Sequence, residues 1–332
     1  MAAPWATAGS CKPIIEIDYG FSNGFDIRVA GCTVKGLIIN TGGTCISFST
    51  AAVTSGTVQG CWTGLNQAGT ATGTVPQQGV SITAAASGIL IGGNSCALRN
   101  VFLASNNGGV FLDNAANNTI IGNYFNTNAA GTAFISPGSP QSCIRFQNNS
   151  IGNIIGTNAA GQGNLLCINN AQAIYNQAGC NNTQIVNNKI NTDLTGNTMM
   201  PAAGATHSIH VEGASNGLIQ NNTMAICATT GMQFDASASS SWLIQNNNIG
   251  VGANGTANIC YAAGQFGIQT QNNSTKIVID GNVIGFGKSD GIQCSGPGTA
   301  STNDSIAVIN NKIGTQASGI KSGVNYGFTH RG

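Results

Sequence analysis

The stretch 218-LIQNNTM-224 decides the fold, because it returns along the chain with only small changes. A second copy, LIQNNNI, occupies 243–249. The other copies share an apolar start, an asparagine and an apolar end, and they are IIGNYF (120–125), QIVNNKI (184–190), IVIDGNVI (277–284) and AVINNKI (307–313), with weaker ones at ALRNVF (97–102) and SIGNII (150–155). The aligned asparagines are Asn100, Asn123, Asn153, Asn188, Asn222, Asn247, Asn282 and Asn311. Neighbours in this series are 23 to 35 residues apart, which is a period typical of solenoids.

A second landmark, a short strand of alternating pattern, follows each asparagine. Examples are CIRFQ (143–147), AIYNQ (173–177), SIHVE (208–212) and GMQFD (231–235). The distance from the asparagine to the first apolar residue of this strand is either 10 or 21 residues. We therefore expect an 11-residue insertion at one corner of some coils. The insertions resemble one another, as in NTNAAGTAF (126–134), GTNAAGQGN (156–164), NTDLTGNTM (191–199) and GVGANGTAN (250–258).

Stacking is what such a unit needs, because one coil alone has nothing against which to bury its apolar residues. Stacked coils pair each strand in parallel with its copies, about 4.8 Å apart. The repeated asparagines then lie above one another, where their amides can bond to each other and to nearby backbone. The 47 glycines and the scarcity of helix-forming Lys, Glu and Arg agree with an all-β chain of many tight corners.

The pattern resembles right-handed parallel β-helix proteins of the pectate-lyase-like superfamily. The GTNAAG and NTDLTGN corners are most similar to bacterial surface or secreted members with GTDATGT-like turns. The resemblance covers roughly residues 14–325 and implies a single-stranded right-handed parallel β-helix of about ten to eleven coils. We expect an N-terminal cap over 1–20, the β-helix over 21–322 and a C-terminal tail over 323–332. The architecture hosts lyases, hydrolases, epimerases, adhesins and tailspikes, so the fold alone does not fix an activity.

Composition limits the possible partners. Only 6% of residues are charged and the formal net charge is +1, so no basic stripe is available for nucleic acid. No apolar run approaches the roughly 20 residues that a membrane span needs, and we expect no membrane insertion. The N-terminus shows no signal-peptide pattern, so we expect a trimmed chain or another export route. Eleven cysteines scatter over the predicted coils. We expect most of them to be buried free thiols.

Alternation within the second strand sorts its side chains. Since Ile209 and Val211 point inward, His210 and Glu212 point outward. The same register gives one outward pair in every coil. The middle pairs carry most of the chemistry, and they are Phe111/Asp113, Arg145/Gln147, Tyr175/Gln177, His210/Glu212 and Gln233/Asp235. The scarce charges of the chain are therefore expected to converge on one patch.

Two readings of this patch stay open. In the first, Glu212 and Asp235 lie in adjacent coils and raise one another's proton affinity, at a spacing near the ~5–5.5 Å of retaining glycosidases. His210 would carry protons, and the substrate-binding residues would be Arg145, Tyr175, Asp113, Gln233 and Gln177, flanked by the long corner loops. The protein would then recognise, and cleave by a glycosidase or lyase reaction, an extracellular polysaccharide or cell-surface glycan.

In the second reading the patch is an ordinary solvated face of a non-catalytic adhesin or structural β-solenoid. Neither reading calls for a cofactor or a metal. The open ends of a β-helix also leave room for a homo-oligomer or a larger parent protein.

Overall fold

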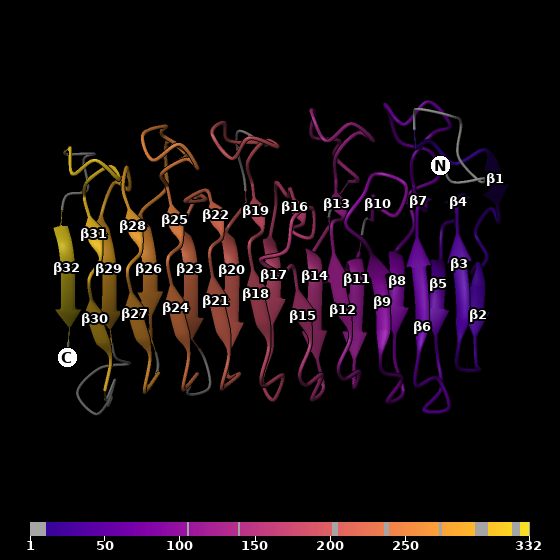
Figure 1. Ribbon diagram of the computed structural model, residues 1–332, viewed down its shortest axis with the longest axis horizontal. Coiled ribbons are helices and arrows are strands. Elements are labelled where there is room, and N and C mark those ends of the chain that lie inside the picture. The colour runs from indigo at the N-terminus through magenta and orange to yellow at the C-terminus, as the bar shows by residue number, and fades with distance from the viewer. Residues whose placement is uncertain are drawn as a thin grey trace.

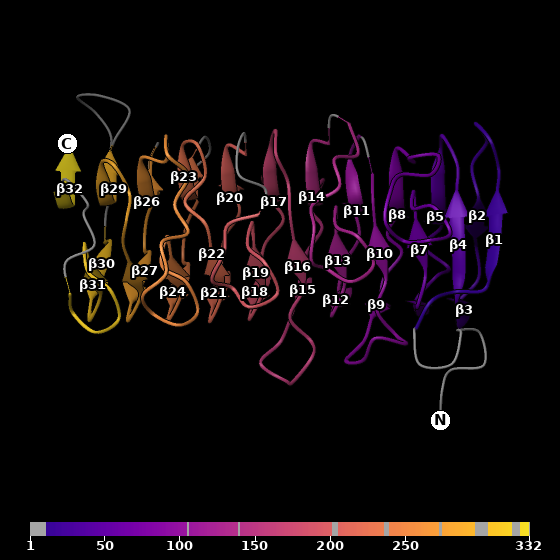
Figure 2. The same cartoon turned by 90° about the horizontal axis from the view of Figure 1, so that it is seen from above.

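The computed structural model describes residues 11–331 apart from 105, 139, 201–204, 236–238, 272–273, 296–304 and 321–325. Part of the predicted N-terminal cap and part of the predicted tail lie outside the described residues. The described residues form strands and turns and no helix, and none of them makes an apolar helix of bilayer-spanning length. Their 32 strands belong to three parallel sheets that run along a rod (Figures 1 and 2).

Each coil contributes one strand to each sheet, except that the last coil has no described strand in sheet 3. Sheet 1 consists of β1 (Ile15–Asp18), β4 (Leu37–Asn40), β7 (Trp62–Thr63), β10 (Val101–Phe102), β13 (Tyr124–Phe125), β16 (Leu165–Leu166), β19 (Lys189–Ile190), β22 (Thr223–Met224), β25 (Asn248–Ile249), β28 (Val283–Ile284) and β31 (Lys312–Ile313). Sheet 2 consists of β2 (Phe25–Ile27), β5 (Thr44–Phe48), β8 (Gln78–Ile82), β11 (Gly108–Asp113), β14 (Ser142–Gln147), β17 (Gln172–Asn176), β20 (His207–Glu212), β23 (Thr230–Asp235), β26 (Phe266–Thr270), β29 (Asp290–Ser295) and β32 (Tyr326–Arg331). Sheet 3 consists of β3 (Cys32–Lys35), β6 (Gly56–Gln59), β9 (Ile89–Gly92), β12 (Thr119–Ile121), β15 (Ile154–Ile155), β18 (Gln184–Val186), β21 (Leu218–Gln220), β24 (Leu243–Gln245), β27 (Val278–Asp280) and β30 (Ala307–Ile309).

The chain is a single-stranded right-handed parallel β-helix, and two of its sheets have 11 strands, which agrees with the predicted number of coils. The regular structure reaches further than the predicted range 21–322. β1 lies inside the expected cap and pairs with β4, while β32 lies inside the expected tail and pairs with β29. These two strands can pair because each of them continues a sheet at an end of the rod (Figure 1).

The corner from sheet 3 to sheet 1 explains the repeated Asn-Asn motif. The first residue of the motif has a positive φ, 57° at both Asn187 and Asn221. Glycine takes the same place in other coils, with φ of 66° at Gly122 and 65° at Gly281. Asparagine and glycine are the residues that adopt this left-handed conformation most readily. The corner thus selects the residue just before the repeated asparagine.

The second residue of the motif belongs to a continuous row of amide hydrogen bonds. The backbone N–H and the Nδ2 of Asn188 both donate to Oδ1 of Asn222, at 2.8 and 3.0 Å. Asn222 repeats this pattern toward Asn247, at 2.9 and 3.0 Å. The members of this asparagine column are Asn100, Asn123, Asn164, Asn188, Asn222, Asn247, Asn282 and Asn311. All but Asn311 are buried, so the column satisfies backbone groups that the sharp corner would otherwise leave unpaired.

Asn153 was wrongly aligned with this column. Its Oδ1 accepts hydrogen bonds from the backbone N–H and the Nδ2 of Asn118, at another corner. The column contains Asn164 instead. The error arises because the insertion 156–164 lies between β15 and β16, whereas the other three predicted insertions follow β13, β19 and β25. Spacing alone does not reveal the corner at which an insertion lies.

The insertions between sheets 1 and 2 fold back as small hairpins. Antiparallel bridges close them between Thr127 and Phe134, between Thr192 and Met199, and between Val251 and Asn258. Their apolar side chains pack against sheet 1, in a cluster apart from the main core that includes Leu194 and Met200. We expected these loops to flank the outward face of sheet 2. The first two hairpins instead place apolar side chains on sheet 1, among them Phe134, Leu194 and Met200.

The cysteines follow the prediction for the most part. Nine are free, and seven of these are buried: Cys45, Cys61, Cys143, Cys167, Cys180, Cys227 and Cys294. Burial raises the pKa of Cys61, Cys180 and Cys227 to about 11, so these thiols are inert. Cys11 and Cys96 form a disulfide that fastens the N-terminal segment to the turn before β10.

Candidate functional site

The outward residues of sheet 2 lie in one row, as the alternation predicts. Strand pairing places Arg145 beside Tyr175, Tyr175 beside His210, and His210 beside Gln233. The inward neighbours Ile209 and Val211 have no exposed surface. The row therefore brings together residues that are 23 to 35 positions apart in the sequence, with about 4.8 Å between successive strands.

Three planar side chains stack at the centre of this row. The rings of Tyr175 and His210 are nearly parallel, with an interplanar angle of 11° and centroids 4.9 Å apart. The guanidinium carbon of Arg145 lies 5.5 Å from the Tyr175 centroid, on the neighbouring coil. The stack holds Tyr175 in place and puts a positive charge beside its ring.

The two predicted catalytic carboxylates have separate partners. The hydroxyl of Tyr175 donates a hydrogen bond to Oε2 of Glu212. Nε2 of His210 lies 2.7 Å from Oδ1 of Asp235, and only 12% and 17% of these two side chains are exposed. At this burial the His210–Asp235 contact is shielded from much of the solvent screening that weakens surface ion pairs.

The expected rise in proton affinity is not found at Asp235. Burial acts to raise the pKa of this carboxyl, but the hydrogen bond and charge of His210 outweigh it and leave the pKa below its usual value. Glu212 and Asp235 are register neighbours, as predicted. Their side chains have separate partners, however, because Asp235 faces His210 and Glu212 accepts a hydrogen bond from Tyr175.

Tyr175 keeps its proton over a wide pH range. Burial and the hydrogen bond to Glu212 raise the pKa of Tyr175 to about 12. The hydroxyl is therefore a hydrogen-bond donor at neutral pH. Nε2 of Gln177 lies 3.4 Å from the same oxygen, which connects this predicted binding residue to the centre of the row.

Arg145 is oriented by neutral groups. Its Nε and Nη2 both donate to Oε1 of Gln177 at 3.2 Å, and its Nη1 donates to Oε1 of Gln141 at 2.6 Å and to Oδ1 of Asn107 at 3.3 Å. Within the part of the chain that the structure describes, no carboxylate forms an ion pair with it. Its positive charge is thus fixed in position without a compensating negative charge.

The remaining predicted binding residues lie at the two sides of this centre. Asp113 accepts hydrogen bonds from Nε2 of Gln147 at 3.0 Å and from Nδ2 of Asn148 at 2.7 Å. Nε2 of Gln233 donates to Oδ2 of Asp235 at 2.5 Å, which fixes the carboxylate that faces His210. Asp113 extends the polar face toward the N-terminal coils, and Gln233 orients the carboxylate that faces His210.

The sequence analysis did not identify His207 as a residue of this site. β20 begins at His207, and its ring centroid lies 5.0 Å from that of His210. Its Nδ1 is 2.6 Å from the hydroxyl of Thr230. Burial and the neighbouring His210 lower the pKa of His207 to about 4. The spacing His-x-x-His was the available signal, but strict alternation puts the two residues on opposite faces.

A surface depression of about 380 Å³ lies at the Arg145 end of the row. Its lining includes Arg145, Tyr175, Gln141 and Gln172. His210 does not line the depression, but Nε2 of the lining residue Gln172 is 3.4 Å from Nδ1 of His210. The described residues contain no cluster of three or more His, Cys, Asp or Glu side chains that could hold a metal ion.

Comparisons with known proteins give structural likeness only. No family model matches the chain, and no curated protein matches it in sequence. Among solved structures, the periplasmic alginate epimerase AlgG is 12% identical with a TM-score of 0.41, covering 98% of this chain and 80% of that one. The mannuronan C-5 epimerase AlgE4 A-module of Azotobacter vinelandii is 11% identical with a TM-score of 0.38, covering 93% and 88%. The Dettilon tailspike protein is 16% identical with a TM-score of 0.38, covering 82% of this chain and 61% of its own.

Proposed function

We propose that the outward face of sheet 2 from Arg145 to Asp235 binds an extended acidic polysaccharide and performs acid–base chemistry on it. The uncompensated charge of Arg145 carries this proposal. Its guanidinium is held by amide oxygens and stacked toward Tyr175. A guanidinium fixed in this way suits the carboxylate or sulfate of a sugar.

The pair of His210 and Asp235 supplies a proton acceptor. When Nε2–H donates to Asp235, Nδ1 holds the lone pair, as in other histidines oriented by a carboxylate. Its partner in this structure is Nε2 of Gln172, at a long 3.4 Å, which a bound substrate would replace. Tyr175, whose raised pKa of about 12 keeps its hydroxyl protonated at neutral pH, supplies a proton donor beside His210. A base, a donor and an Arg in one row favour proton abstraction next to a sugar carboxylate, followed by elimination.

Hydrolysis by Glu212 and Asp235 is the second chemistry for the same face. Their backbones are register neighbours, about 4.8 Å apart, close to the carboxyl spacing of ~5–5.5 Å in retaining glycosidases. The low pKa of Asp235 suits a nucleophile. Glu212 accepts a hydrogen bond from the hydroxyl of Tyr175. In this chemistry Glu212 would be the acid that donates a proton to the leaving-group oxygen of the sugar.

We further propose an extracellular or cell-surface place of action. The Cys11–Cys96 disulfide is typical of oxidising compartments. The seven buried free thiols are compatible with the same compartment, because they are shielded from oxidants.

The test compares acidic with neutral polysaccharides, measuring binding, new reducing ends and the ultraviolet absorbance of unsaturated uronate. We expect Arg145→Gln to weaken binding of acidic chains about tenfold and to leave neutral chains unaffected. Glu212→Gln and Asp235→Asn should each lower turnover about 10²–10⁴-fold. Ser47→Ala, in the same outward row but in an early coil, is the matched control and should change nothing.

The readouts separate the alternatives. Unsaturated products indicate elimination, whereas reducing ends without them indicate hydrolysis. If the wild-type protein binds no polysaccharide and changes none, the face is structural and the proposal fails.

A further inference from the structure

The outer face of sheet 1 carries features that the site on sheet 2 does not use. Strand pairing places Trp62, Val101 and Tyr124 next to one another on this face. Two depressions open along it, of about 410 and about 200 Å³, and both are lined by Arg99. The larger one is within the ~300–1,000 Å³ of small-ligand sites.

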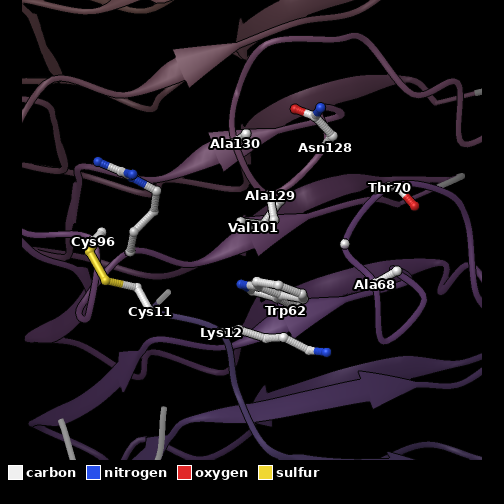
Figure 3. A pocket seen from close by; sticks show the side chains of 12 residues that line it. Cys11, Lys12, Trp62, Ala68, Thr70, Cys96, Val101, Asn128, Ala129 and Ala130 are labelled. Carbon is white, nitrogen blue, oxygen red and sulfur yellow. A yellow bond between two sulfur atoms is a disulfide. The ribbon is translucent and has the colours of Figure 1, made fainter. Parts of the chain in front are cut away.

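Trp62 lies at the centre of the larger depression, between the Cys11–Cys96 disulfide on one side and Thr70 on the other (Figure 3). The loop residue Gly69 packs so closely that an added Cβ would lie 2.8 Å from Cζ3 of the Trp62 ring. Its φ of 70° likewise suits glycine alone. The backbone of this loop therefore packs directly against the Trp62 ring and forms one wall of the depression.

The indole N–H groups of two tryptophans differ in their surroundings. That of Trp242 donates to the carbonyl of Ala214 at 2.8 Å. That of Trp62 donates to no described residue and is not among the buried atoms that lack a partner, so it is open to a ligand or to water in the depression. The hydroxyl of Thr70 and the amide of Asn128 line the same space. These groups fit a ligand with hydroxyls around an apolar ring.

Arg99 adds a positive charge between the two depressions. Its guanidinium carbon lies 4.0 Å from the centroid of the Tyr124 ring, and its Nε donates to the carbonyl of Gly122 at 3.3 Å. The lining of the two depressions includes Lys12 and Lys189 and no Asp or Glu. In a chain of net charge +1, this concentration of cations marks a site for a negative group.

We propose that this face is a second binding site, for a single sugar residue that carries a carboxylate, with its hydroxyls near Trp62 and its carboxylate on Arg99. The proposal does not depend on acid–base chemistry at sheet 2. It would supply a fixed attachment point for an acidic glycan on a different sheet from the row of Arg145. A sulfate or phosphate ion alone lacks the hydroxyls that the indole N–H, Thr70 and Asn128 would bind.

The experiment is a titration followed by the indole N–H signals in two-dimensional ¹⁵N NMR of the full chain. The chain has three tryptophans, and Trp62→Phe assigns the signal of interest. The probes are glucuronate, glucose and sulfate, of which the first two differ only in the carboxylate. We expect glucuronate to shift the Trp62 signal saturably, and glucose and sulfate to bind at least about tenfold more weakly.

Variants connect the shift to the proposed contacts. Arg99→Met keeps the apolar stem over Tyr124 and should weaken glucuronate binding at least about tenfold. Arg99→Lys keeps the charge but loses the guanidinium stacked on Tyr124, so its affinity should fall between those of wild type and Arg99→Met. Arg145→Gln should leave this titration unchanged, which separates the second site from the first. The proposal is overturned if glucuronate does not shift the signal, if glucose or sulfate binds equally well, or if Arg99→Met, folded by its thermal transition, binds like wild type.

Discussion

The asparagine column and the outward row of sheet 2 are both stacks built from one residue per coil, but they differ in what they repeat. The column has the same neutral side chain in eight successive positions, each bonded to the next. The row changes its residue in every middle coil, from Arg145 to Tyr175 to His210. Repetition along a stack therefore points to architecture, and a local departure from repetition points to chemistry.

The physical reason lies in burial. A buried amide needs a donor and an acceptor in fixed places, and an identical amide in the next coil supplies both. An outward position makes no such demand, so selection for ligand contact can act on it. Accordingly, changes in the column should affect stability, and changes in the row should affect binding or turnover.

The largest effect is expected from breaking the column. Asn222→Ala removes the acceptor for two hydrogen bonds from Asn188 and the donor to the carbonyl of Ile185. Leaving these buried groups unpaired should lower the free energy of unfolding by about 3 kcal/mol, measured by urea denaturation. Gln220→Ala, two residues earlier and half-buried, is the control and should cost less than about 1 kcal/mol. Equal losses in the two variants would contradict the role given to the column.

The intermediate effect comes from His207. Its pKa falls from 6.5 to about 4 on folding, so between these values the unfolded chain binds more protons. Stability is therefore unaffected above about pH 6.5, falls as the pH drops toward 4, and then levels off after a loss of about 2–3 kcal/mol. His207→Asn should flatten the unfolding free energy over this window. If the variant shows the same pH dependence as wild type, His207 is not the titrating group.

The smallest effect on stability is expected in the row itself. Tyr175→Phe removes the hydroxyl that donates to Glu212, but the half-buried carboxylate can bind water instead. The free energy of unfolding should fall by about 1 kcal/mol or less, measured by the same denaturation. Polysaccharide binding or turnover should decrease more than this loss of stability explains. If Tyr175→Phe loses as much stability as Asn222→Ala, the main role of Tyr175 is structural.

Much of this structure could be predicted from the sequence. The parallel β-helix and its register follow from the Asn motif and from the alternation in SIHVE, because periodicity directly encodes which side chains are buried. The row of Arg145, Tyr175 and His210 followed from the same register.

What the sequence did not reveal depends on side-chain direction and on loops. The strand register makes Glu212 and Asp235 neighbours. It does not determine that the side chain of Glu212 turns toward Tyr175 and that of Asp235 toward His210. Asn164 was missed because an insertion shifted its spacing. The face around Trp62 was missed because it combines a sheet 1 strand with hairpin loops. Alignment of the residues next to the column would have shown Trp62 and Tyr124 in one outward line.

Each coil pairs only with its two neighbours, and this gives the molecule modular length. Excision of residues 223–247, one turn of the solenoid, would bring Asn222 against Asn282 and His210 against Gln269. The asparagine column would remain continuous across the deletion. His210, however, would lose the carboxylate of Asp235 and gain the amide of Gln269 as its neighbour. A single genetic event of this size could thus remove the proposed reaction centre and leave the scaffold whole, and a duplication could lengthen the outward face of sheet 2 in steps of one coil.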